Sequence, residues 1–269
     1  MSGWTLTLQT ASALRLDLRG LSPAALSTLT VAEVERLTVG CGNALLPLAE
    51  CFQVTARDDD ALHFVGDLSR CDRIGWQMDG GRLVVEGSAG NYAGAGMKAG
   101  TLTVQGSAGA LAACEMAGGT LTIDGNAGDF AASTLPGSMD GMRGGTLIVR
   151  GHVGARFADR MRRGTAVVFG DAGDFLASRL VAGTVLLGGR CGAHPGYGMR
   201  RGSLVFAAGG PEAPPTFVPA IADAPVFWQL LARDLARHGG VFAGLPARRI
   251  DRQLGDLAAD GKGEWIAVR

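Results

Sequence analysis

Four basic residues in this sequence each directly follow a methionine, within segments that resemble one another: Lys98, Arg143, Arg162 and Arg200. Cationic side chains that are brought together on one surface repel each other and attract a negatively charged molecule. The chemistry that these residues suggest is therefore electrostatic binding of an anion. A solvated surface, or a contact with a partner protein, remains an alternative explanation for the same residues.

The cysteines and histidines do not form a pattern that is typical of a metal site. Iron–sulfur and structural zinc sites need closely spaced ligand pairs, because one loop has to present two ligands to one metal. The segment Cys191-Gly-Ala-His194 is a single pair without a second pair downstream. Five cysteines, an odd number without framework spacing, argue against a set of disulfides. We therefore expect small, buried, free cysteines and no metal in this chain.

Motifs of nucleotide binding and of nucleophilic catalysis are missing from the sequence. No GxxxxGK[ST] is present, the two lysines are Lys98 and Lys262, and neither GxSxG nor HExxH occurs. The histidines stand in unrelated contexts, at positions 63, 152, 194 and 238. We expect no catalytic residue in this chain, while a site assembled from residues far apart in sequence stays open.

The glycines mark a regular internal repeat. Of 269 residues 43 are glycine, more than twice the usual share of roughly 7%. Segments such as Gly100-Thr-Leu-Thr-Val-Gln-Gly106 and Gly119-Thr-Leu-Thr-Ile-Asp-Gly125 recur 19 residues apart. The glycines that open them stand at positions 81, 100, 119, 145, 164, 183 and 202. One step is 26 residues long, and its seven extra residues fall in the Pro- and Gly-containing stretch 133–141.

This repeat predicts an all-β fold. Alternating apolar residues, such as Leu102 and Val104, have the period of a strand, and 19 residues are too few for a repeat of two helices. One turn of a right-handed, three-sided parallel β-helix suits about 19 residues, with glycines at corners that need positive φ. We expect eight to nine turns. A column of long apolar residues should fill the interior: Met78, Met97, Met116, Met142, Met161, Leu180 and Met199.

The two ends of the chain differ from the repeats. Residues 1–35 predict a cap, with a strand at 4–8 and a helix that begins with the capping box Thr30-Val-Ala-Glu33. The β-helix should span residues 36–210, where 37–40 and 63–66 are the strand ends of two looser turns. Residues 211–269 predict a Pro/Ala linker, an amphipathic helix over 226–238 and a tail. Such ends would cover the open strand edges of the stack.

Charge and hydropathy limit the partners and the location. The 25 basic and 25 acidic residues cancel, which argues against a general binder of nucleic acid or of an acidic membrane. No run of 18 apolar residues and no secretory signal occur, so we expect a cytoplasmic protein. The charge is nevertheless uneven: residues 143–201 hold ten arginines and three aspartates, whereas residues 79–142 hold two basic and six acidic residues.

A family resemblance follows from the glycine pattern. The recurring Gly-x-x-Gly-x-x-x-Gly/Ala, seen at 87, 90 and 94 and again at 106, 109 and 113, resembles the glycine-repeat β-helix of the C-subunit family of formylmethanofuran dehydrogenase. The C-terminal domain of the glutamate synthase large subunit shares that pattern. The chain looks most like the C (gamma) subunit of the formyltransferase/hydrolase complex of methylotrophic bacteria. The match is strong over residues 36–210 and weak at the ends.

The resemblance implies a noncatalytic structural subunit of a cytosolic complex that works in one-carbon oxidation. Other subunits would transfer a formyl group from formyl-tetrahydromethanopterin to a methanofuran-type carrier with a glutamate chain, and hydrolyse it to formate. The implied partners are a metal-dependent, amidohydrolase-like A subunit, a B subunit and a formyltransferase D subunit. The basic column at Lys98, Arg143, Arg162 and Arg200 would then face the anionic carrier.

Two other interpretations stay open. The alternative is a scaffold β-helix in a glutamate-synthase-like or formylmethanofuran-dehydrogenase-type oxidoreductase, and the proteins that accompany the chain would separate these cases. An independent enzyme that acts on polysaccharide is the third interpretation. Such enzymes carry acidic or basic catalytic groups along one face, and no acidic column recurs in this sequence.

Overall fold

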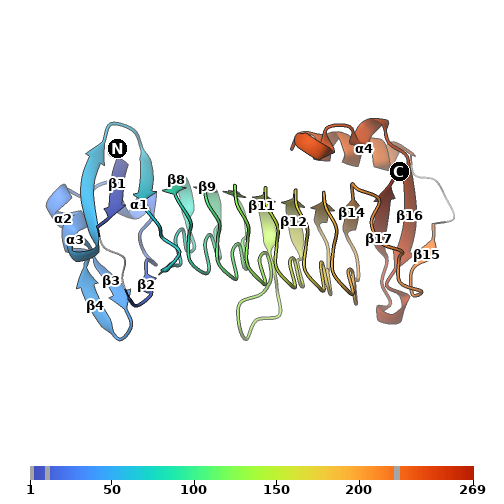
Figure 1. The fold of residues 1–269 in the computed structure, drawn as a ribbon, viewed down its shortest axis with the longest axis horizontal. Coiled ribbons are helices and arrows are strands. Elements are labelled where there is room, and N and C mark those ends of the chain that lie inside the picture. The colour runs from blue at the N-terminus through green and yellow to red at the C-terminus, as the bar shows by residue number, and fades with distance from the viewer. Residues whose placement is uncertain (1–2, 10–12, 221–224) are drawn as a thin grey trace.

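The chain folds into an elongated row of stacked strands (Figure 1). A computed structural model describes residues 3–9, 13–220 and 225–269. Within these residues the strands form a 13-stranded sheet and a separate four-stranded sheet. The N-terminal segments lie at one end of the row, and helix α4 (Pro225–Ala236) lies beside the other end (Figure 1).

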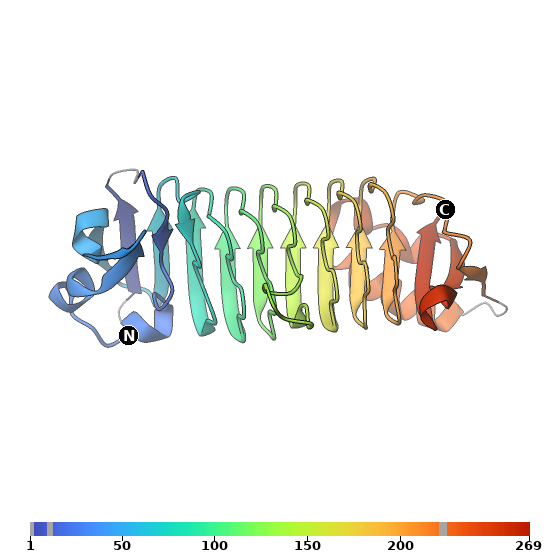
Figure 2. The ribbon, with the colours of Figure 1, turned by 90° about the horizontal axis from the view of Figure 1, so that it is seen from below.

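Parallel pairing links most of the large sheet, whose strands stand side by side along its length (Figure 2). Neighbouring repeats pair in register, so that Leu102 lies opposite Leu121 and Leu121 lies opposite Leu147. The seven extra residues between the strands of Leu121 and Leu147 therefore loop out without changing the register. The strands of this ladder are β6 (Ala61–Val65), β8 (Asp79–Glu86), β9 (Ala99–Val104), β10 (Thr120–Ile123), β11 (Arg143–Val149), β12 (Arg163–Val168), β13 (Thr184–Leu187) and β14 (Ser203–Phe206).

A second ladder runs alongside the sheet. Single parallel bridges join one residue of each repeat to the same position of the next, at Leu68, Ala89, Ala108, Ala127, Val153, Ala172 and Cys191. The predicted parallel stacking of 19-residue repeats is thus confirmed at two positions of each repeat. The 19-residue spacing predicts this register because apolar residues recur at the same position of each repeat.

Strands from outside the repeats extend the ladder at both ends. Strand β1 (Gly3–Leu8) pairs parallel with β6, and β17 (Gly263–Val268) pairs parallel with β14. Antiparallel neighbours follow: β5 (Phe52–Arg57) beside β1, and β16 (Ile250–Gly255) with β15 (Val218–Pro219) beyond β17. The sequence repeat does not reveal β1 and β17, because neither segment carries its glycines.

The prediction that residues 37–40 form the strand end of a β-helix turn is wrong. Strand β3 (Thr38–Cys41) belongs to the four-stranded sheet, antiparallel to β2 (Leu16–Asp17) and β4 (Ala44–Pro47), with β7 (Cys71–Asp72) at the edge. Gly42, at φ +60°, reverses the chain directly after β3, which produces a hairpin. The expectation for residues 63–66 is confirmed, since they end the parallel strand β6.

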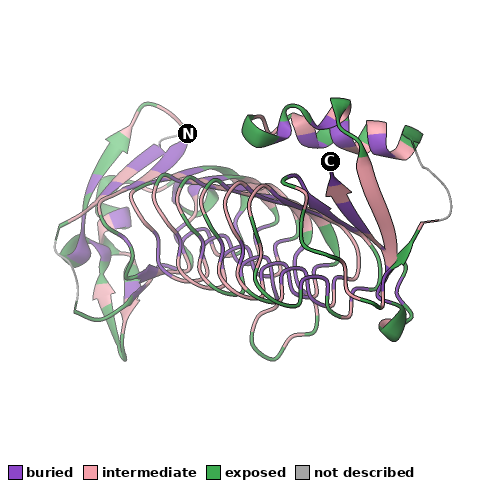
Figure 3. Cartoon of the chain, turned by 45° about the vertical axis from the view of Figure 1, so that its right-hand side comes forward, coloured by how far each residue is buried: buried purple, intermediate pink, exposed green. Residues whose placement is uncertain are grey.

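The interior of the stack is apolar, and the methionine column lies inside it as predicted. Figure 3 shows the buried residues along the inner side of the repeats. Each opening glycine is required for two reasons: its φ is positive, and the structure has no space for a Cβ at its position. Gly119 has φ +79°, and a Cβ there would lie 2.8 Å from the terminal methyl group of Met97. The same pairing recurs along the chain, for example between Gly145 and Met116.

Two further glycines of the repeat, the closing Gly106 and Gly154, which follows the closing Gly151 by three residues, have a different reason from the positive φ that we predicted for corners. Gly106 and Gly154 do not have positive φ, but a Cβ would lie 2.6 Å from Ser88 Oγ and 2.1 Å from Asp129 Oδ1. These polar side chains accept hydrogen bonds from backbone N–H groups of the next repeat. The acceptors form two columns: Ser88, Ser107, Asn126, His152 and Asp171, and Asp72, Asn91, Asp129 and Asp174.

Short helices cover the N-terminal end: α1 (Pro23–Leu26), α2 (Val31–Arg36) and α3 (Leu48–Cys51). The predicted capping box is confirmed, with the Thr30 N–H donating to Glu33 Oε2 at 2.7 Å.

At the other end, α4 covers the outward side of the last strands (Figure 1). It ends two residues before the predicted position, and three short 3-10 turns follow, at Gly240–Phe242, Leu245–Ala247 and Leu257–Ala259. None of the helices within the described ranges is both long and apolar enough to cross a membrane.

Candidate functional site

The basic column lies at the corner where the chain enters the large sheet. The backbone N–H of Arg143 donates to the Met116 carbonyl at 2.7 Å, and that of Arg162 to the Met142 carbonyl at 2.7 Å. Arg200 repeats this contact with Leu180 at 2.8 Å. All four predicted side chains, including Lys98, are exposed. Ala117 and Val181 occupy the same position in the intervening repeats, so the column is interrupted.

Two members of the column hold the inserted loop. Arg162 Nε forms an ion pair with Asp140, which belongs to that loop. Arg143 Nη2 lies 3.4 Å from Glu115 Oε2, and the other oxygen of Glu115 accepts the N–H of Leu135 at 3.4 Å. Both arginines therefore have carboxylate partners within the chain. Their charge is partly neutralised, and each has a structural task that the sequence did not reveal.

Exposed cations without a carboxylate partner gather near the C-terminal end of the same corner. They are Arg163, Arg200, Arg201 and Lys262, which we call the C-terminal basic patch, and the described residues hold no ion pair for any of them. The Lys262 N–H donates to the Arg200 carbonyl at 2.6 Å, which sets β17 directly beyond the last repeat. Lys98 is far from this patch, beside β9. The sequence analysis missed Lys262 because β17 lies outside the repeats.

The cysteine and histidine side chains show neither a disulfide nor a metal-binding group within the described residues. The cysteines are free, and no group of three or more His, Cys, Asp or Glu side chains that could hold a metal occurs among the residues that the structure describes. Burial raises the pKa of the Cys71 thiol to about 12. The His194 ring stacks on Phe175 with centroids 5.1 Å apart.

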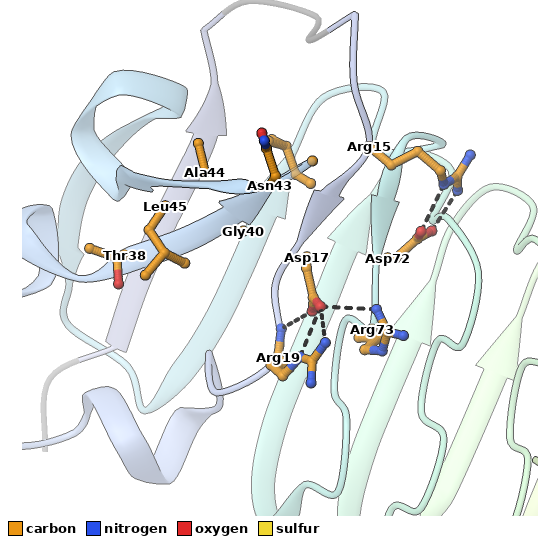
Figure 4. A pocket seen from close by; sticks show the side chains of 12 residues that line it. Arg15, Asp17, Arg19, Thr38, Gly40, Asn43, Ala44, Leu45, Asp72 and Arg73 are labelled. Carbon is orange, nitrogen blue, oxygen red and sulfur yellow. Dashed lines mark hydrogen bonds and ion pairs between the residues drawn. The ribbon is translucent and has the colours of Figure 1, made fainter.

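A polar cleft at the N-terminal end was not foreseen (Figure 4). It has a volume of about 500 Å³ and lies between the hairpin β3–β4 on one side and β2 with the start of the repeats on the other. Its polar lining comes from Arg15, Asp17, Arg19, Asp72 and Arg73, together with Thr38 and Asn43. These residues come from segments far apart in sequence, so spacing could not reveal the cleft.

Ion pairs fix the arginines of this cleft. Arg15 Nε donates to Asp72 Oδ2 at 2.7 Å, as drawn in Figure 4. Asp17 Oδ2 accepts Arg19 Nε at 2.8 Å and Arg73 Nη1 at 2.9 Å. Burial acts to raise the pKa of Asp17, but the hydrogen bonds from Arg19 and the charge of Arg73 outweigh it and lower that pKa. The Asp17 carboxyl therefore favours its ionised form, and both carboxylates already accept hydrogen bonds from the protein.

A buried polar cluster lies at the base of the inserted loop. Asp159, 4% exposed, accepts hydrogen bonds from Ser178 Oγ and from Arg179 Nη2, the latter at 3.0 Å. The Ser133 hydroxyl, fully buried at the start of the loop, has no hydrogen-bond partner among the described residues. The same repeat position holds Asp159 and Ser178 in the next two repeats, so the repeat alignment could have signalled this polar column.

Comparisons with known proteins identify relatives of this chain. No family model matches it. It is 42% identical over 76 residues to the C subunit of the formyltransferase/hydrolase complex Fhc of Methylorubrum extorquens, a segment that covers 28% of this chain and 29% of that relative. It also matches a chain of the crystal structure of the formyltransferase/hydrolase complex FhcABCD from Methylorubrum extorquens in complex with methylofuran. That match has a TM-score of 0.90 and 40% identity, and covers 97% of this chain and 98% of the other. The predicted resemblance is therefore confirmed: the chain belongs to the C-subunit family of the formyltransferase/hydrolase complex.

Proposed function

We propose that this chain is a noncatalytic structural subunit of a formyltransferase/hydrolase complex. The observation that carries the proposal is the match of 97% of the chain, at 40% identity, to a chain of the FhcABCD complex. A long, rigid stack offers extended surfaces for neighbouring subunits.

The proposed partners and small molecules follow from the same relative. The chain would assemble with A, B and D subunits in the cytoplasm. A metal-dependent A subunit would hydrolyse the formyl group to formate, after the D subunit has transferred it from formyl-tetrahydromethanopterin. The carrier would be methanofuran-type, since the related complex is described with methylofuran. This chain would bind no cofactor of its own.

The proposed scaffold is a right-handed, three-sided parallel β-helix. The in-register strands, the second ladder of bridges and the inward methionines support this architecture. We retain the division into 1–35, 36–210 and 211–269 as a proposal, with β1 and β17 joining both terminal parts to the same sheet.

We further propose that the basic corner attracts the anionic chain of the carrier. Lys98, Arg143, Arg162 and Arg200 would contribute, with Arg143 and Arg162 also holding the inserted loop. Arg200 supports this role best, because it is exposed beside Arg201 and Lys262. In the assembled complex, Arg200→Gln should raise the KM for the carrier more at low salt than at high salt. An unchanged KM and salt dependence would assign the corner to solvent or to contacts between subunits.

The experiment that tests the proposed function compares the complex with and without this chain. Co-expression of the A, B and D subunits alone should yield little assembled complex, and adding this chain should restore assembly and formate release. The isolated chain should release no formate from a formylated carrier. Formate release by the purified chain alone, or full assembly and activity without it, would refute the structural role.

A further inference from the structure

We propose that the polar cleft at the N-terminal end binds a small organic anion that carries a carboxylate or phosphate group. The cleft is lined by β2, the hairpin β3–β4 and Asp72 with Arg73 at the start of the repeats, and its volume of about 500 Å³ suits a small molecule. It lies at the opposite end of the stack from the C-terminal basic patch (Figure 1). The proposal therefore does not depend on the role proposed for the basic corner.

The charge balance of the cleft favours an anion. Three arginines face two aspartates, and the protein already donates four hydrogen bonds to Asp17 and three to Asp72. Asp72 Oδ1 accepts the Asn91 N–H at 2.7 Å in addition to Arg15, and Asp17 Oδ1 accepts the Arg19 N–H at 3.1 Å. One positive charge is left over, and the carboxylates have little capacity to bind a further cation.

The arginines also have donors to spare. Asp17 takes Nε and Nη2 of Arg19 and Nη1 of Arg73. Within the described residues, Nη1 of Arg19 and both Nε and Nη2 of Arg73 donate to no protein atom. Planar guanidinium groups with adjacent free N–H donors match the two oxygens of a carboxylate or phosphate. Such a ligand would supply the acceptors that the cleft lacks.

Arg73 is held in place before any ligand arrives. Its guanidinium carbon lies 4.9 Å from the centre of the Tyr92 ring and 5.6 Å from that of Trp76. Together with the ion pair to Asp17, these contacts fix the direction of its free donors. A preorganised donor loses less side-chain entropy when it binds a ligand than a freely moving one does.

The other wall of the cleft is partly apolar. Leu45 of β4 lines it and is 71% exposed, beside Ala44 (Figure 4). Thr38 and Asn43 add polar side chains on the same hairpin. A ligand with an apolar portion next to its anionic group would cover Leu45 while the arginines hold the anion. The structure thus favours an organic anion over an inorganic one.

Four probes separate these features: acetate, benzoate, inorganic phosphate and phenyl phosphate, titrated into the full chain at constant ionic strength. Amide shifts in an NMR titration should concentrate at residues 15–19, 38–45 and 70–73. The phenyl compounds should bind about threefold tighter than acetate or phosphate, and Leu45→Ser should remove that difference. The stronger of the carboxylate and phosphate series identifies the anionic group of the ligand.

Variants of the arginines complete the test. Arg73→Gln should weaken binding at least about tenfold, and Arg73→Lys should not restore it, because lysine lacks the planar fork. If Arg73→Gln fails to fold, Arg19→Gln, whose side chain is 62% exposed, carries the same expectation. Arg233→Gln on α4 removes the same charge at the other end and should leave binding unchanged. Amide shifts that scatter over the whole surface and are equal in Arg19→Gln and Arg233→Gln would overturn the proposal. The absence of binding by all four probes would overturn it as well.

Discussion

The outward side of the large sheet differs between its two halves, although the inward side repeats the same pattern throughout. Facing outward, β9 and β10 carry Thr103 and Thr122, which are partly exposed. At the same position β12, β13 and β14 carry Val167, Leu186 and Val205, all fully buried beneath α4 and its neighbours. The inward ladder thus sets the register, whereas the outward residue decides whether a repeat is covered.

This difference teaches how the stack acquires distinct surfaces from identical repeats. The covered half has a second core, separate from the interior one, that includes Trp228, Leu235 and Phe242. The uncovered half presents a threonine-bearing sheet face at β9 and β10, beyond the reach of α4 (Figure 1). The uncovered face is therefore the side on which a neighbouring subunit has direct access to the strands.

The largest expected effect comes from placing a carboxylate on each half. Leu186→Asp should reduce the free energy of unfolding by at least about 3 kcal/mol, because it removes a buried apolar side chain and desolvates a charge. Thr122→Asp should cost less than about 1 kcal/mol, since water reaches this position. Urea unfolding followed by circular dichroism measures both. Equal losses in the two variants would contradict the comparison.

The second core should also depend on a single large side chain. Trp228 is 4% exposed, and its indole N–H donates to the Arg248 carbonyl at 3.0 Å. Trp228→Ala should cost about 3–5 kcal/mol. Hydrogen exchange should then accelerate in α4 and on the outward face of β12–β14, while β8–β10 remain protected. Uniform acceleration in all repeats would show that the two cores are not separate.

Removing one acceptor from a polar column should have a smaller effect. Asn126 Oδ1 accepts the His152 N–H at 2.8 Å. Asn126→Ala should cost about 1 kcal/mol, because the N–H lies near the surface where water can replace the lost partner in part. Asn126→Asp retains the acceptor and serves as the control. A loss above about 3 kcal/mol in the alanine variant, measured by urea unfolding, would mean that the column is far more important than this geometry indicates.

The smallest effect concerns pH in the covered half. Burial lowers the pKa of His238, two residues after the end of α4, although Asp234 acts in the opposite direction. The folded state therefore favours the neutral ring, so this contribution to stability is present above the unfolded pKa of about 6.5 and is lost as pH falls through the folded value. Unfolding midpoints from pH 7.5 to 5 should show this decline, and His238→Gln should flatten it. An unchanged slope in the variant would exclude His238 as its source.

Much of the fold could be predicted from the sequence, because the repeat specifies it locally. Opening glycines, alternating residues such as Leu121 and Ile123, and the capping box at Thr30 each produce the structure that their local chemistry favours. The strand predicted at 4–8 is confirmed as β1, but its pairing with β6 and the whole of β17 could not be predicted, since the exposed edges of the stack select these partners. The outward change from Thr122 to Val167 was a readable signal for the position of α4.

The candidate sites were less predictable than the fold. Repeat spacing correctly brings Arg143 and Arg162 to one corner, but it contains no information on their partners Glu115 and Asp140. Asp140 belongs to the inserted loop, and Lys262 reaches the corner only through β17. The polar cleft combines Asp17, Thr38 and Arg73 from three separate segments. Long-range contacts of this kind leave no trace in local spacing.

Native mass spectrometry of the tagged chain, purified gently from the cells that make it, tests the proposed role most directly. We predict that the chain is released only as part of an assembly with A, B and D subunits in fixed proportions. Leu186→Asp should destabilise the isolated chain and also reduce the amount of assembled complex, since it should detach α4 from the sheet. A chain that elutes as a monomer in native extract, with neither a formyltransferase nor a hydrolase bound to it, would contradict the account.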